Sequence, residues 1–188
     1  MSLVDQLAPI GVKPEAVEFV GISHHHGDHT GQLAAFPKAT LLIGQGDWDL
    51  LRPDAPPAGL DAKAHAARRA PFAPWIAGGS VQALTRDRHD VFGDGSVLML
   101  NLPGHTPGHH GLLVKLAATG PVLLTGDVTH FHENYRSDGI PTWNTDRADS
   151  LASLDRFRKI AANLKATVII QHDPRDVAKL PVFPEFAK

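Results

Sequence analysis

Apolar residues occur along this chain in short runs, and Gly, Asp or Pro residues separate most of these runs. Runs of this length that are enriched in Val, Ile, Leu and Phe are typical of buried strands. We therefore expect strands over residues 17–22, 39–43, 81–84, 90–92, 97–102, 111–116, 122–125 and 167–170. Between two of them, Gly93-Asp94-Gly95 predicts a hairpin turn.

One stretch has the helical period instead of the strand period. Over residues 149–164, apolar side chains recur every three or four positions, while charged side chains occupy the opposite face. The apolar positions are Leu151, Leu154, Phe157, Ile160, Ala161 and Leu164. Shorter helices, each followed closely by a proline, are expected over residues 3–8, 30–36, 45–51 and 61–70.

The order of these elements predicts the fold class. Strands joined by hairpins, with helices between them, favour a layered α/β fold in which helices lie outside two packed sheets. A chain of 188 residues suits a single domain, 1–188. The segment from Pro53 to Pro74 lacks clear periodicity and contains several prolines. This segment is either a loop that covers a substrate or a plain surface excursion.

Composition narrows the classes of function. Hydrophobic residues make up 43% of the chain and charged residues 20%, as in ordinary globular proteins, and no segment reaches the length of a membrane span. The formal net charge of −2 argues against nucleic acid or an anionic membrane surface as the main partner. The first ten residues lack the basic start and long apolar run of a secretory leader, so we expect a cytoplasmic protein.

Histidine is the compositional anomaly, with 12 residues in the chain, and four of them lie within residues 24–29. Imidazoles packed this densely after an apolar strand indicate metal binding. The chain has no cysteine, so the ligands must be nitrogen and oxygen. Because side chains alternate along an extended segment, we expect His24 and His26 on one face and His25 on the other.

Other candidate ligands follow the bend at Gly27 or the ends of later strands. Taken singly they are weak signals, because such residues are more often turn residues or caps. Taken with the first cluster, they supply enough nitrogen and oxygen ligands for two ions and a shared water. One ion would take His24, His26 and His105, the other Asp28, His29 and His172, with Asp127 between them.

The metallo-β-lactamase superfamily has a ligand set that these motifs resemble. The matching residues are His24-x-His26-x-Asp28-His29, Gly104-His105-Thr106-Pro107-Gly108-His109, Gly126-Asp127 and His172. Within the superfamily, the N-acyl-homoserine lactonases are the branch that is most similar. The resemblance implies an αββα sandwich that holds two metal ions. Zinc is expected from the nitrogen-rich ligands, although iron, manganese and cobalt accept the same residue types.

The resemblance also implies a reaction, in which a hydroxide that bridges the two ions attacks a lactone or ester carbonyl. Asp28 and Asp127 then count among the catalytic residues, with Asp127 bridging and orienting. His130 stands where the lactonases usually place a tyrosine, and we expect its ring to donate to the reacting oxygen. Two alternatives stay open: a β-lactam hydrolase that uses the same hydroxide, and a truncated metal-binding protein without activity.

The chain departs from the family at its start. Members of this fold usually begin with several strands before the histidine cluster, yet only 23 residues precede His24. The fold is therefore expected to be N-terminally shortened. A second copy of the chain is expected to cover the sheet that those strands would otherwise cover, which predicts a homo-oligomer.

The remaining histidines and four aromatic residues lie outside the predicted ligand set. We expect His65 and His89 at the surface, and His109 and His110 in turns or behind the ligands. Two positions are equally open for His132: the wall of the site and an exposed loop. Four aromatic residues either line an apolar substrate pocket or belong to the core: Phe72, Trp75, Tyr135 and Trp143.

Overall fold

The computed structural model describes residues 2–188 and divides the chain into two compact units. The first unit runs to Leu84, and the second unit runs from Thr85 to Lys188. Each unit contains a sheet with helices, so the predicted α/β class is confirmed. The single domain and the packing of one sheet on the other stay predictions.

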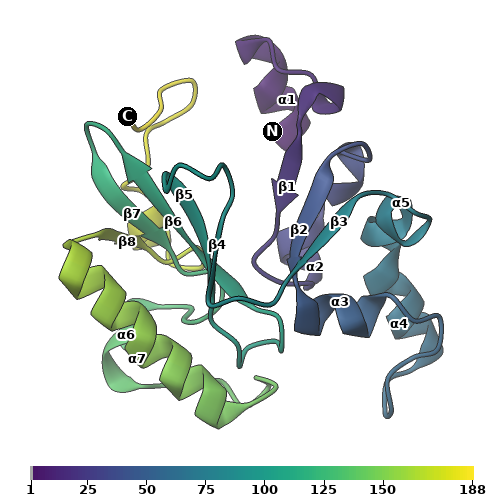
Figure 1. Ribbon diagram of the computed structural model, residues 1–188. Helices are drawn as coiled ribbons and strands as arrows, with labels where there is room; N and C mark the ends of the chain where they lie inside the picture. The colour runs from purple at the N-terminus through teal and green to yellow at the C-terminus, as the bar shows by residue number, and fades with distance from the viewer. Residues whose placement is uncertain (1) are drawn as a thin grey trace. The chain divides into compact units, whose positions relative to one another are not determined.

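The first unit contains a three-stranded parallel sheet in the order β1-β2-β3. Its strands are β1 (Phe19–Gly21), β2 (Thr40–Gly44) and β3 (Val81–Leu84). Its helices are α1 (Leu3–Leu7), α2 (Gly27–Thr30), α3 (Gln45–Leu51), α4 (Ala62–Arg69) and α5 (Ala73–Ile76) (Figure 1). The central strand β2 is apolar and almost wholly buried, which is typical of a strand that is covered on both faces.

Aromatic side chains fill the core of the first unit. Phe72 and Trp75 pack with Ile43 of β2 and with Leu51 of α3. The indole N–H of Trp75 donates to the carbonyl of Ala39 at 2.8 Å, so this buried polar group is satisfied. Of the two interpretations left open for Phe72 and Trp75, core and pocket wall, the structure therefore favours the core.

The second unit contains a five-stranded sheet in the order β4-β5-β6-β7-β8. Its strands are β4 (Arg88–Asp90), β5 (Val97–Asn101), β6 (His110–Leu116), β7 (Gly120–Leu124) and β8 (Thr167–Ile169). Neighbouring strands are antiparallel except for β7 and β8, which are parallel. Its helices are α6 (His132–Ser137), α7 (Arg147–Leu164) and α8 (Pro174–Val177) (Figure 1).

The long helix α7 covers one face of this sheet. The strand register aligns Leu98, Leu113 and Leu123 across three neighbouring strands. Leu154 and Phe157 of α7 pack against this row and are almost completely buried. The Asp146 side chain accepts the backbone N–H of Asp149 and caps the helix, which places its start two residues before the predicted one.

Two predicted elements are wrong in part. Residues 30–36 do not form one helix: α2 ends at Thr30, and a separate 3-10 turn spans Leu33–Ala35. The non-helical backbone of Gln32, which follows Gly31, explains the break. The strand predicted over residues 90–92 lies instead at Arg88–Asp90.

The hairpin turn explains the shift of that strand. The Asp90 carboxylate accepts the backbone N–H groups of Gly93 at 3.0 Å and Gly95 at 2.7 Å, which draws the following residues into the turn. Both glycines have positive φ, at 78° and 76°, a conformation that glycine adopts without a steric cost. The predicted turn at residues 93–95 is confirmed, since β4 and β5 pair as antiparallel neighbours.

His65 was expected at the surface, and this prediction is wrong. Its side chain is buried in α4, and its Nε2 donates to the Pro53 carbonyl at 2.9 Å. Arg69, one turn later, donates to the Leu51 carbonyl. The proline-punctuated segment is therefore anchored to the end of α3.

Among residues 2–188, none of the helices combines the length and the apolar composition needed to cross a bilayer.

Candidate metal centre

The histidine cluster of the first unit lies on the loop between β1 and α2. His24 Nε2 lies 3.0 Å from His26 Nδ1, so these two side chains share one side, as the alternation of an extended segment predicts. The rings of His24 and His29 have centroids 4.2 Å apart. His29 Nε2 lies 3.3 Å from the Asp28 carboxylate. The first unit thus gathers four of the predicted ligands: His24, His26, Asp28 and His29.

Neighbouring polar groups orient this loop. The Ser23 hydroxyl lies 3.0 Å from His24 Nδ1 and 3.3 Å from His29 Nδ1, so a single side chain contacts both rings. The Thr30 hydroxyl donates to the His26 carbonyl at 3.1 Å. These contacts restrain the imidazoles before any ligand binds, which lowers the entropy cost of binding.

The second unit brings three strand ends together. The pairing of Leu124 with Ile169 in the parallel strands β7 and β8 puts Asp127 and His172, each three residues further on, at the same edge. Strand β5 runs in the same direction as β7, because each is antiparallel to β6, so His105 follows β5 at that edge too.

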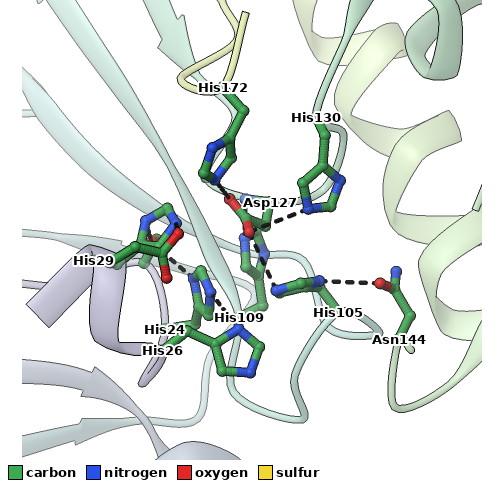
Figure 2. Close-up of polar contacts among 12 residues, drawn as sticks. His24, His26, His29, His105, His109, Asp127, His130, Asn144 and His172 are labelled. Carbon is green, nitrogen blue, oxygen red and sulfur yellow. Dashed lines mark hydrogen bonds and ion pairs between the residues drawn. The ribbon is translucent and has the colours of Figure 1, made fainter. Parts of the chain in front are cut away.

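The histidines of the second unit converge on one carboxylate. His105 Nε2 lies 3.3 Å and His130 Nε2 3.2 Å from Asp127 Oδ2, and His172 Nε2 lies 3.2 Å from Oδ1 (Figure 2). The His130 and His172 rings are stacked, with centroids 5.4 Å apart. The structure therefore brings His130 to the predicted ligands of this unit.

His109 supports the Asp127 carboxylate from behind. The backbone N–H of Asp127 donates to His109 Nε2 at 2.8 Å. His109 is therefore an acceptor at Nε2, and its Nδ1 donates to the Leu102 carbonyl at 2.9 Å. The side chain is fully buried. The sequence left His109 either in a turn or behind the ligands, and the structure identifies Asp127 as the residue that it holds.

Gly104 lets the His105 loop pass close to the start of α7. Its φ is +128°, and a Cβ atom there would lie 2.3 Å from the backbone nitrogen of Ser150. The Gly104 carbonyl accepts the backbone N–H of Asp146 at 3.0 Å. A side chain at this position would push the His105 loop away from the helix.

Two residues beside His105 and His130 come from the segment before α7. Asn144 Oδ1 lies 3.0 Å from His105 Nδ1, a contact that the sequence analysis missed because asparagine has no place in the ligand motif (Figure 2). Trp143 was a candidate for a pocket wall. Its side chain is 71% exposed, and its ring centroid lies 6.2 Å from that of His130.

Ion pairs hold the segments that carry His130 and His172. His132 Nε2 lies 2.8 Å from Asp176 Oδ1, and the backbone N–H of His132 donates to the Asp173 carboxylate at 3.1 Å. Arg175 donates to Asp173 and to Glu133. The Arg175 hydrogen bonds hold the pKa of Asp173 well below its usual range and lower the pKa of Glu133 to about 2.

The donor set of each unit suits a metal ion. Two nitrogen or oxygen ligands on one tetrahedral zinc ion, each about 2.0–2.1 Å from it, lie about 3.3 Å apart. The separations of His24 from His26, and of His105 from Asp127, are 3.0 and 3.3 Å. Buried imidazoles beside a carboxylate at this spacing fit zinc or a similar cation. The assembly of both groups of ligands into one centre stays a prediction.

Known proteins resemble the chain over almost its whole length. A family model described as the metallo-beta-lactamase superfamily matches residues 1–172. An N-acyl homoserine lactonase, AttM, from Rhizobium radiobacter is 32% identical over 97% of this chain and 68% of its own. An N-acyl homoserine lactonase from a Bacillus species is 28% identical over 98% of this chain and 67% of its own. The chain thus spans about two thirds of the length of these relatives.

Solved structures resemble the chain in fold. One is an N-acyl homoserine lactone hydrolase with the product N-hexanoyl-L-homoserine bound at its catalytic metal center. It has a TM-score of 0.77 at 23% identity and covers 98% of this chain and 67% of its own. The dizinc quorum-quenching lactonase AidC has a TM-score of 0.70 at 20% identity and covers 92% of this chain and 63% of its own. At these identities the likeness concerns the fold.

Proposed function

The chain belongs to the metallo-β-lactamase superfamily, and from this premise we propose that it is a metal-dependent hydrolase that opens lactones. The substrates that we propose are N-acyl homoserine lactones or closely related esters. The convergence of three histidine Nε2 atoms on the Asp127 carboxylate carries the proposal. The curated lactonases that are similar over almost the whole chain support the choice of substrate.

We propose two metal ions per chain, with zinc favoured by the nitrogen-rich ligands. The ligands that we assign are the predicted ones of each unit: His24, His26, Asp28 and His29 from the first, and His105, Asp127 and His172 from the second. Bound ions of this kind lower the pKa of water and polarise a carbonyl oxygen. No Gly-x-Ser-x-Gly motif occurs in the chain, so a serine nucleophile of that type is not available.

The protein groups around the ligands have the following proposed roles. Asp127 orients the reacting groups, and His109 holds it in place by accepting its backbone N–H. His130, beside Asp127, donates a hydrogen bond to the oxygen that gains charge as the carbonyl is attacked. The exposed ring of Trp143, next to His130, offers an apolar surface for the acyl chain.

A comparison of substrates tests the proposal. Zinc-replete protein should open an N-acyl homoserine lactone faster than it cleaves a chromogenic cephalosporin. Faster cleavage of the cephalosporin would replace the lactonase assignment with a β-lactamase one. Hydrolysis of neither substrate by folded, metal-loaded protein would leave a metal-binding protein without activity.

A further inference from the structure

We infer that Asn144 is a positioning residue that holds the His105 ring in one tautomer, with the hydrogen on Nδ1 and the lone pair on Nε2. The role of Nε2 as a metal ligand rests on the proposed function, but the assignment of the tautomer does not. Asn144 lies 39 residues from His105 in the sequence, and the fold brings its side-chain oxygen to 3.0 Å from Nδ1 (Figure 2).

A chain of hydrogen bonds fixes the orientation of the Asn144 amide. A serine hydroxyl has one hydrogen to donate, and Ser150 donates it to the Asp146 carbonyl at 2.5 Å. The Ser150 oxygen therefore accepts from Asn144 Nδ2, which lies 2.9 Å away. The amide oxygen is then the atom that faces His105.

This orientation determines where the imidazole carries its hydrogen. An amide oxygen can only accept, so His105 Nδ1 must donate to it. In the neutral ring, Nε2 is left with a lone pair, and it lies 3.3 Å from the Asp127 carboxylate. Under the proposed function, this lone pair is the one that would bind the metal ion.

The backbone around His105 is held by the same segment. The backbone N–H and the hydroxyl of Thr145 both donate to the His105 carbonyl, at 3.3 and 3.1 Å. The His105 side chain is 2% exposed, so water has little access to replace a lost partner. Asn144 therefore acts on a ring whose backbone is already fixed.

The full chain without metal permits a test that is independent of activity. Long-range ¹H–¹⁵N spectra report the tautomer of each histidine, and loss of a signal in His105→Gln assigns that of His105. We expect the Nδ1–H tautomer in the unaltered protein and in Asn144→Asp, which keeps an acceptor. We expect a mixture in Asn144→Leu, which has a similar volume and no acceptor.

Zinc affinity provides the second measurement. Competition with a chelator should show about 10–100-fold weaker binding in Asn144→Leu, the usual effect of removing the partner of a ligating histidine. Asn144→Asp should bind zinc much more tightly than Asn144→Leu does. Asn134→Leu is the matched control, because Asn134 is a half-buried asparagine of the same unit that donates to the Gly139 carbonyl. This control should match the unaltered protein in both measurements.

Two results would overturn the inference. One is an unchanged His105 tautomer in folded Asn144→Leu, and the other is an equal loss of zinc affinity in Asn134→Leu. If Asn144→Leu does not fold, Ser150→Ala provides the same test, because it frees the amide to turn and should also give a mixture. A tautomer that depends on Asn144 in a protein that opens no lactone would contradict the proposed function alone.

Discussion

The Asp47 carboxylate contacts His25 twice: Oδ2 accepts the backbone N–H of His25 at 3.1 Å and lies 3.1 Å from the ring Nδ1. Both side chains are buried, with Asp47 on α3. His25 therefore contacts the helix that follows β2, whereas His24 and His26 contact each other. Of the three consecutive histidines, His25 therefore holds the loop against α3, whereas His24 and His26 belong to the candidate metal centre.

We predict different effects for substitutions at two neighbouring histidines, on activity for one and on stability for the other. His26→Ala should abolish metal-dependent hydrolysis, because it removes a proposed ligand. His25→Ala should keep most of the activity and lower the free energy of unfolding by about 1–3 kcal/mol, because the buried Asp47 carboxylate loses a polar neighbour. Rates on zinc-replete protein and urea unfolding measure the two effects. Equal loss of activity in both variants would show that the assignment of the two rings is wrong.

The acid stability of the second unit should depend on Glu133. Arg175 donates to both Glu133 oxygens, at 3.0 and 2.7 Å, and lowers the pKa of Glu133 from 4.5 to about 2. A lowered folded-state pKa contributes stability that is present above the unfolded-state pKa and is lost as the pH falls toward the folded-state pKa. Glu133→Gln should therefore flatten the loss of stability between pH 4.5 and pH 2.

Unfolding curves at a series of pH values measure this effect. Glu15→Gln is the control, because Glu15 is an exposed glutamate in the first unit. It should leave the acid limb of the stability curve close to that of the unaltered protein. A Glu133→Gln curve that is as steep as the unaltered one would contradict the prediction.

A substitution at His130 tests whether its ring acts in catalysis or in substrate binding. If its ring donates to the reacting oxygen, His130→Ala should lower kcat more than it raises KM. The loss of transition-state stabilisation should be roughly 2–4 kcal/mol at most, since a single donor is removed. Steady-state kinetics on an N-acyl homoserine lactone separate the two constants. An increase in KM at constant kcat would assign His130 to the wall of the site instead.

The sequence predicted the elements whose signals are local. Helix α3 and strand β2 were expected at nearly their observed bounds. A short apolar run defines the strand, and apolar spacing with a following proline defines the helix. The meeting of His105, Asp127 and His172 was predicted from the strand ends that carry them. These features depend on residues that are close to one another in the sequence, or on the general rule that strand ends share an edge.

The features that the sequence analysis missed depend on contacts between distant segments. The burial of His65 follows from the packing of α4 near Pro53, and the role of Asn144 follows from a loop 39 residues after His105. A polar residue in such a loop has no periodicity that would single it out. The homo-oligomer and the cytoplasmic location stay predictions, and sedimentation at low micromolar concentration would measure the first.

Zinc titration of metal-free protein, followed by the rate of lactone opening, tests the central claim most directly. The full chain is stripped with a chelator, zinc is added stepwise, and the opening of N-hexanoyl homoserine lactone is measured at each step. The proposed centre predicts almost no activity without metal, a rise that ends at two zinc ions per chain, and loss of activity when the chelator returns. Lactone opening at the same rate without metal, or none at any zinc content in folded protein, would contradict it.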